Sequence, residues 1–184
     1  MKQDNLWTNT FFKKSTDETF EVIKNTPLFE GLSTRELKEI EKIVHNRQYA
    51  KGENIFQEEE PGMGMYIIKS GKVKIITKVN DNESELAQLG LGDLFGELAL
   101  LDEFPRSATA VAVEKTEVIA IFRPDFFDLM HRNTGLGLKI ALKLAQMIGI
   151  RLRAANNRLK EIETMEIKNY ELKIKNGGKE GEGN

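Results

Sequence analysis

The sequence of 184 residues contains no cysteine and only two histidines. The lack of cysteine excludes disulfides, zinc–thiolate sites and cysteine nucleophiles. With so few histidines, a metal centre would have to be built mostly from oxygen ligands. We therefore expect a protein that binds no metal.

Long apolar runs and an excess of one charge are also missing. No stretch approaches the ~18 apolar residues that cross a bilayer, and residues 1–5 lead into no secretory signal. The 27 basic and 29 acidic residues give a net charge of −2, which attracts neither nucleic acid nor acidic lipid. These features predict a cytoplasmic protein with no membrane partner.

Catalytic signatures are absent as well. The sequence holds no GxxxxGK[ST], no HExxH and no GxSxG motif. A metal-dependent enzyme of the cupin-like barrel class would need a histidine cluster that this chain lacks. We expect a protein that is not an enzyme.

The length predicts one main domain with helical appendages. Residues 1–27 mix aromatic and polar positions and are interpreted as an N-terminal helical appendage. Ser33 and Glu36 have the spacing of a capping box, which predicts a helix over residues 33–45 that ends near His45. Residues 28–165 are predicted to form the main domain, and the polar, glycine-rich residues 166–184 a disordered tail.

Between Arg47 and Phe122 the pattern changes to short β-branched runs separated by turn residues. This spacing predicts antiparallel strands. The whole chain is therefore expected to be an α+β fold: an antiparallel β-roll or jelly-roll barrel flanked by N-terminal helices and a long C-terminal helix. The runs comprise residues 55–56, 65–68, 73–76, 85–89, 107–113 and 117–122.

Pro124 starts a short helix, and a long helix is predicted from about residue 136 to 165. Two apolar stripes follow this helix, so it needs two burial partners. One interpretation packs one stripe on the barrel and pairs the other, an alanine-rich seam, with a second subunit in a homodimer. Burial of both stripes against residues 1–45 is equally compatible. The seam comprises Ala141, Ala145, Ile148, Leu152, Ala155, Leu159 and Ile162.

The stretch from Phe95 to Ala110 carries the clearest chemistry. Gly96 permits a tight turn, and the helix formers that follow are expected to make about two turns whose free N–H groups attract an anion. Arg106 suits two phosphate oxygens, and Ser107 adds a hydroxyl. Glu97 would repel an anion but could accept a hydrogen bond from a sugar hydroxyl. Phosphate plus ribose fits this set, although composition alone favours a plain Glu97–Arg106 ion pair.

The run FGELALLDEFPRSATA resembles the phosphate-binding cassette of cyclic nucleotide-binding domains. The family includes the regulatory subunits of cAMP-dependent protein kinase and the catabolite activator proteins. The similarity extends to GMYIIKSGKV and GDLFGE upstream, and it covers about residues 28–155.

This resemblance implies that Glu97 accepts from the ribose 2′-hydroxyl and that Arg106 pairs with the exocyclic phosphate oxygens. Gly96, Leu98 and Ala99 would supply backbone contacts, and Ser107 a polar contact to phosphate. The implied base pocket comprises Ile75, Leu86 and Ala87, with Arg151, Ala155 and Asn156 as candidates on the long helix.

The function implied is a stand-alone cyclic nucleotide sensor whose C-terminal helices move on binding and regulate an effector protein. Ser107 in place of threonine resembles cAMP-preferring members, with cGMP as the alternative ligand. Only about 20 polar residues follow the long helix, so no DNA partner is expected. The alternative from another class is a protein-interaction module in which nucleotide binding is incidental.

Overall fold

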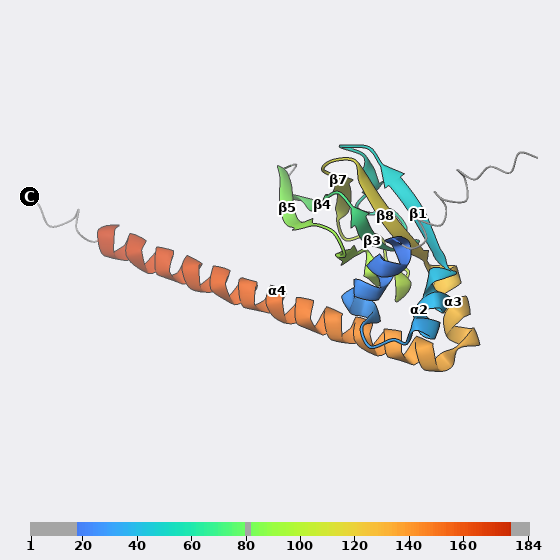
Figure 1. The fold of residues 1–184 in the computed structure, drawn as a ribbon. Helices are drawn as coiled ribbons and strands as arrows, with labels where there is room; N and C mark the ends of the chain where they lie inside the picture. The colour runs from blue at the N-terminus through green and yellow to red at the C-terminus, as the bar shows by residue number, and fades with distance from the viewer. Residues whose placement is uncertain (1–17, 80–81, 178–184) are drawn as a thin grey trace, which may run out of the picture. The chain divides into compact units, whose positions relative to one another are not determined.

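The computed structural model describes residues 18–79 and 82–177 (Figure 1). The chain divides into two compact units, Met1–Ala141 and Leu142–Asn184. Residues 18–25 are helical, and the rest of the predicted N-terminal appendage lies outside the described residues. All the strands lie in the first unit.

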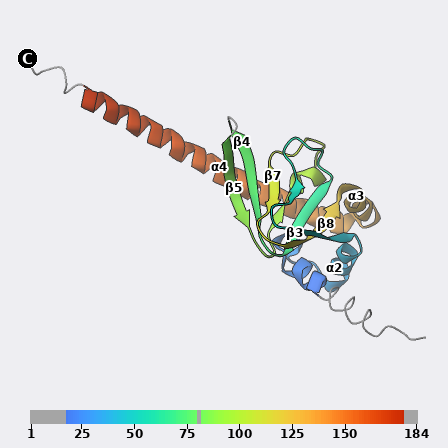
Figure 2. The ribbon, with the colours of Figure 1, turned by 90° about the horizontal axis from the view of Figure 1, so that it is seen from above.

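Within the described ranges, eight strands form two antiparallel four-stranded sheets, with orders β1-β8-β3-β6 and β2-β7-β4-β5. In Figure 2, which views the molecule from above, the β4–β5 hairpin lies apart from β3 and β8. The predicted antiparallel β-roll flanked by helices is confirmed. The first sheet comprises β1 (Val44–Tyr49), β3 (Gly64–Ser70), β6 (Leu94–Phe95) and β8 (Thr116–Phe122). The second comprises β2 (Asn54–Phe56), β4 (Val73–Val79), β5 (Asn82–Leu89) and β7 (Thr109–Ala112).

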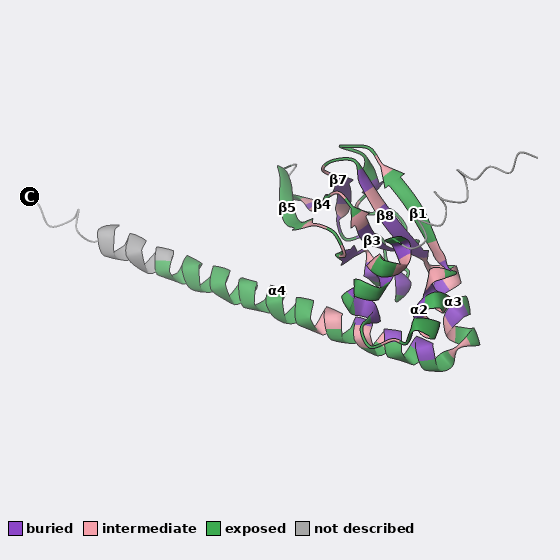
Figure 3. Ribbon diagram, in the orientation of Figure 1, coloured by how far each residue is buried: buried purple, intermediate pink, exposed green. Residues whose placement is uncertain are grey.

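The core lies between the two sheets, and β3 and β8 of the first sheet are buried along most of their length (Figure 3). In β4 and β7 of the second sheet, alternate side chains point inward. Val73 and Ala110 are fully buried, and they meet Tyr66 and Phe95 from the other sheet. Lys74 and Val111, their neighbours in the chain, pair with one another and so face outward. The strands were predicted from a different signal, the short β-branched runs between turn residues.

Short helices gather beside the first sheet (Figure 1). The helix of residues 18–25 contacts β3 through Glu18, whose carboxylate lies 3.6 Å from the buried Lys69 ammonium. The 3₁₀ helix η1 (Pro27–Phe29) precedes α2 (Thr34–Glu41), and α3 (Arg123–Arg132) follows β8. Apolar side chains of these helices, including Ile23 and Ile40, are fully buried.

The predicted helix over residues 33–45 is correct at its start and wrong at its end. Ser33 is the N-cap, and both hydrogen bonds of the capping box are present. The helix stops at Glu41, because residues from Val44 onward pair with β8 in six consecutive register positions. Sheet pairing overrides the helical spacing here, so His45 lies in a strand, with its Nε2 3.0 Å from an Asp125 carboxylate oxygen.

The long helix α4 (Thr134–Gly177) begins in the first unit and makes up most of the second. Leu136 and Ile140, in its first turns, are buried. The helix continues past residue 165, where the sequence predicted a disordered tail. Residues 166–177 include three lysines, two glutamates and one leucine, residue types that favour helix. Residues 178–184 of the predicted tail lie outside the described residues.

A carboxylate at the start of α2 ties this helix to α4. Glu36 accepts from the Lys139 ammonium at 2.7 Å and from the Ser33 N–H at 2.8 Å. The bond from Lys139, then those from Ser33, lower the pKa of Glu36 from 4.5 to about 2. The carboxylate form is therefore favoured by folding.

Replacing this carboxylate should destabilise the protein in a pH-dependent way. We expect Glu36→Gln to lower the free energy of unfolding at pH 7 by about 1 kcal/mol, a typical value for a lost cap. A carboxyl whose pKa is depressed on folding stabilises above its unfolded pKa. The difference from wild type should therefore shrink as the pH falls from 4.5 towards 2.

Urea unfolding between pH 2.5 and 7 measures the difference. Glu114→Gln, which removes a carboxylate from an exposed turn, is the control. A destabilisation by Glu36→Gln that is equal at pH 3 and pH 7 would contradict the assignment.

Candidate functional site

The site is built around a left-handed glycine. Gly96 has φ 70° and caps the 3₁₀ helix η2 (Glu97–Leu100). This single short helix replaces the two turns expected, and the Ala99 N–H bonds the Gly96 carbonyl at 3.3 Å instead of pointing at a ligand. A Cβ at Gly96 would lie 2.7 Å from Arg106 Nη1 and 3.2 Å from Phe56 Cε1. Only glycine meets both the conformational and the spatial demand.

Arg106 is buried and held at both its backbone and its guanidinium. Its N–H donates to Glu60 O at 2.8 Å, and its carbonyl accepts from Glu59 N at 2.9 Å. Nη1 donates to Gly96 O at 3.0 Å and Nη2 to Gly64 O at 2.7 Å. The side chain therefore bonds two backbone carbonyls, and the charge of Glu97 also acts on it, so the arrangement is more than the simple Glu97–Arg106 ion pair considered from composition.

The position of Gly64 depends on close packing between strands. A Cβ at Gly64 would collide with the Ile121 carbonyl and Phe122 of β8. The tight approach fixes the first residue of β3, whose carbonyl accepts from Arg106. The glycine in the predicted glycine-bounded strand pair thus contributes directly to the site.

The surroundings of the guanidinium combine burial with aromatic rings and carboxylates. Burial lowers the pKa of Arg106, and Tyr66, Glu60 and Glu97 act in the opposite direction. The guanidinium stays charged at neutral pH, because arginine is not deprotonated in proteins. Its Cζ lies 4.0 Å from the centroid of the Phe56 ring and 5.8 Å from that of Tyr66.

One of the three nitrogens of this charged group makes no hydrogen bond. Among the described residues, Arg106 Nε is buried and has no hydrogen-bond partner. A buried donor on a cation favours an anionic acceptor, because leaving it unpaired costs about 1–3 kcal/mol. The site therefore has the chemistry to bind an anion beside a buried carboxylate.

The structure brings most of the predicted cassette together. Glu97 and Ala99 are buried in η2, at 5% and 3% exposure. Leu98 between them is exposed, and Ser107 is exposed directly after Arg106. The cassette thus has a buried side with Glu97 and Arg106 and an outer side with Leu98 and Ser107.

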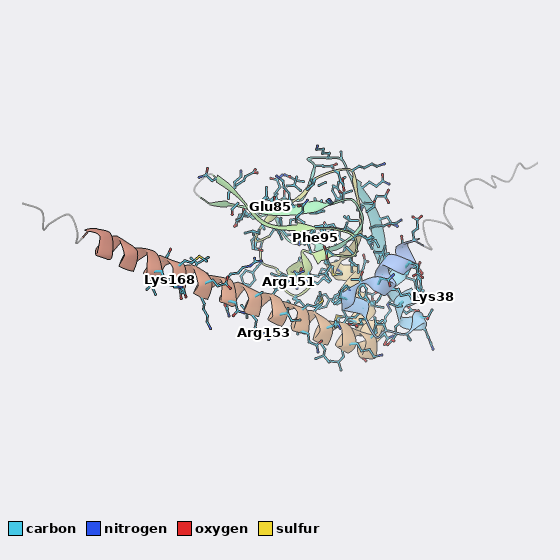
Figure 4. All side chains as sticks on the ribbon, turned by 60° about the vertical axis from the view of Figure 1, so that its left-hand side comes forward. Lys38, Glu85, Phe95, Arg151, Arg153 and Lys168 are labelled. Carbon is cyan, nitrogen blue, oxygen red and sulfur yellow. The ribbon has the colours of Figure 1, made fainter. Side chains whose placement is uncertain are left out.

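The predicted base-pocket positions fall into two groups. Ile75 pairs with Ala87 across β4 and β5, and Leu86 is the extra residue of a β-bulge beside this pair. Figure 4 shows the neighbouring Glu85 on β5 and Phe95 inside the roll. The other group, Arg151, Ala155 and Asn156, is exposed on α4 in the second unit. Their role in base binding stays a prediction.

The cassette loop is linked to the next helix. Arg123, the first residue of α3, lies 3.0 Å from the Glu103 carboxylate in the loop before Arg106. Its N–H donates to Met63 O at 2.9 Å, and its guanidinium lies 5.4 Å from the Phe127 ring. A displacement of the loop would therefore change the Arg123–Glu103 ion pair at the start of α3.

Three contributors were not found from the sequence: the Phe56 ring, the Gly64 carbonyl and the Arg123–Glu103 pair. A carbonyl carries no signature of residue type, and Glu103 and Arg123 lie 20 positions apart with no regular spacing. The aromatic Phe56 at the end of a strand was a usable signal, but it is equally typical of a core residue.

A separate cavity of about 530 Å³ lies on the outward side of the second sheet, lined by Lys74, Ile76 and Val111 among others. None of the predicted ligand-binding residues lines it. Within the described ranges, no group of three His, Cys, Asp or Glu residues could hold a metal ion. No helix there is both long and apolar enough to cross a bilayer.

Known proteins share this arrangement. The model of the family "Cyclic nucleotide-binding domain" matches residues 46–133, from β1 to the end of α3. A "Cyclic AMP receptor protein" of Thermus thermophilus is 41% identical over 148 residues, which cover 80% of this chain and 67% of that protein. The crystal structure of the Thermus thermophilus Catabolite Activator Protein superposes with a TM-score of 0.68 at 40% identity, covering 75% of this chain and 63% of that one.

A third relative is the "CRP-like cAMP-activated global transcriptional regulator" of Mycobacterium tuberculosis, 29% identical over 77% of this chain and 62% of that protein. The expectation that DNA is no partner is therefore wrong: relatives include a regulator of transcription, and this chain spans only about two thirds of their lengths. The position at which the sequence ends is therefore no argument against a DNA partner. The relatives named here are receptors and regulators, not enzymes.

Alanine substitutions at two left-handed glycines should separate conformational strain from crowding at the site. Gly92 (φ 82°) has open space at its Cβ position, whereas Gly96 (φ 70°) faces Arg106 and Phe56. We expect Gly92→Ala to cost about 1 kcal/mol through the backbone alone. Gly96→Ala should cost at least about 1 kcal/mol more, because Arg106 must move. Urea unfolding measures both, and equal losses would contradict the crowded geometry.

Proposed function

The chain belongs to the cyclic nucleotide-binding domain family, and on this premise we propose that it is a regulatory sensor of cAMP without catalytic activity. The observation that carries the proposal is the buried Arg106 guanidinium, whose Nη1 bonds the carbonyl of the cassette glycine and whose Nε–H has no hydrogen-bond partner. A cyclic phosphate has the charge and the acceptors that this group lacks.

Arg106 is assigned to the phosphate. Two of its nitrogens already bond carbonyls, at 3.0 and 2.7 Å, so the guanidinium is oriented before a ligand arrives. A pre-oriented charged donor loses little entropy on binding. Gly96, Leu98 and Ala99 are assigned backbone contacts, and the exposed Ser107 hydroxyl a further contact to phosphate.

Glu97 is assigned to the ribose. Its carboxylate is buried in the same turn as the phosphate-binding glycine, where a second anion would be repelled and a hydroxyl donor attracted. Ile75, Leu86 and Ala87 are assigned to the base. Arg151, Ala155 and Asn156 of α4 are the candidates that cap it.

The choice of cAMP over cGMP rests on two observations. Ser107 follows the arginine where cGMP-preferring members carry threonine. The relatives above are named for cyclic AMP. cGMP remains the alternative ligand.

The proposed output is a population shift that regulates a partner protein. A ligand that pulls the cassette inward would displace the Glu103 loop, and the Glu103–Arg123 ion pair passes this displacement to α3. The α3 and α4 helices would then present a changed surface to an effector. If no ligand binds, the alternative function is favoured: a protein-interaction module in which nucleotide binding is incidental.

Titration calorimetry with cAMP and cGMP tests the site. We expect micromolar or tighter binding of cAMP to wild type and weaker binding of cGMP. Arg106→Ala should weaken cAMP binding by about 100-fold, because each hydrogen bond between charged partners contributes about 1.5–3 kcal/mol. The absence of binding to wild type would refute the proposal.

Two controls sharpen this experiment. Arg47→Ala removes another arginine near an aromatic ring, 6.0 Å from Phe122 and outside the cassette, and should leave affinity unchanged. For the ribose contact, Glu97→Gln is compared on cAMP and 2′-deoxy-cAMP. Wild type should prefer cAMP, and the variant should lose most of that preference.

We further propose that the chain forms a homodimer through α4. The alanine-rich seam leaves Leu152, Leu159 and Ile162 exposed at 59%, 58% and 53%. These side chains repeat at coiled-coil spacing along the helix, and a second copy would bury them. Ala145 lies in the same seam and is exposed.

A charge placed in the seam should separate the subunits. Ala145→Glu is expected to convert a dimer into a monomer in light scattering, because burying an unpaired carboxylate is costly. Gln146→Glu adds the same charge at the adjacent exposed position off the seam and should leave the dimer intact. A monomeric wild type would refute the assignment.

A further inference from the structure

We propose that Phe56 is a positioning residue for Arg106: its ring holds the guanidinium, before any ligand binds, in the orientation that meets an anion. For a cyclic nucleotide this inference rests on the function proposed above. The geometry itself belongs to the ligand-free protein.

The ring and the carbonyls constrain different directions of the guanidinium. Hydrogen bonds from Nη1 and Nη2 lie close to the plane of the group and fix its rotation within that plane. The Phe56 ring lies against it, 4.0 Å from Cζ, well inside the ~6 Å range of a cation–π contact. Together they leave the guanidinium little room to tilt.

The Phe56 ring is itself fixed by aromatic neighbours. Its centroid lies 5.8 Å from that of Tyr66 and 5.9 Å from that of Phe95. Both neighbours are buried, and their rings stack on each other at 5.5 Å. The Phe56 ring therefore packs against two buried rings that restrict its motion, unlike an aromatic ring on the surface.

Gly96 also limits the space around the Arg106 guanidinium. A Cβ at Gly96 would come within contact distance of both Arg106 Nη1 and Phe56 Cε1, so the three residues converge on one point. Replacing the ring by an aliphatic side chain removes the π face and opens a gap there. The guanidinium would then sample orientations that must be lost again on binding.

A purely structural role for Phe56 makes a different prediction. If the ring only fills the core, its loss lowers stability but leaves the affinity of the folded protein and the order of the Arg106 guanidinium unchanged. A positioning role changes both. The two can be separated by measuring the ligand-free and the ligand-bound protein with the same variants.

The ligand-free measurement is nuclear magnetic resonance of the full chain labelled with ¹⁵N-arginine, with the Arg106 Nε–H signal assigned from its absence in Arg106→Lys. We expect a high ¹⁵N order parameter for this N–H in wild type and in Phe56→Tyr, which keeps the ring. In Phe56→Leu the order parameter should fall towards that of exposed arginines, because the guanidinium is free to tilt. Phe56→Met is the second aliphatic variant should the leucine variant fail to fold.

The ligand-bound measurement is calorimetry with cAMP on the same proteins. Phe56→Leu and Phe56→Met should bind about tenfold more weakly, or about 1.4 kcal/mol, and Phe56→Tyr within about twofold of wild type. An aliphatic variant that keeps both the order parameter of the Arg106 Nε–H and wild-type affinity overturns the proposal. Wild type that binds no cAMP refutes the proposed function alone, since the ligand-free spectra still decide whether Phe56 orients Arg106.

Discussion

The structure of the site depends on the burial of one positive charge. The guanidinium of Arg106 leaves water almost completely, and two backbone carbonyls, an aromatic ring and nearby carboxylates replace its hydration. Such a group is costly to bury unless its donors are used. The left-handed Gly96, the tight strand contact at Gly64 and the aromatic cluster are all conditions for meeting that cost. The remaining buried donor sets the preference for an anion.

Much of this could be predicted from the sequence, because the signals were local. Short β-branched runs between turn residues marked β3, β4 and β8, and the Ser33–Glu36 pair marked a helix start that the structure reproduces. The cassette was visible because Gly96, Glu97 and Arg106 lie within 11 consecutive positions. The family resemblance then supplied roles that composition alone left open.

The features that could not be predicted are those set by distant partners. The apolar pattern of α2 runs on to Val44, and only the pairing of β1 with β8, 67 to 77 positions away, makes this segment a strand. The acceptors of Arg106 are carbonyls, which every residue carries. The extension of α4 rests on intrinsic helix preference in a mostly polar segment. In each case the deciding interaction lies outside the window in which a sequence pattern is visible.

Arg106 also joins the two sheets. Gly64 begins β3 in one sheet, whereas Phe56 ends β2 in the other, and both contact the same guanidinium. Binding competence is therefore a property of the closed roll and of no single sheet, and it cannot exist in a partly folded chain. By mass action, any ligand that binds only this closed form adds its binding free energy to the cohesion between the sheets. Folding stability would then depend on ligand concentration, and so would the survival of the chain in a protease-rich environment.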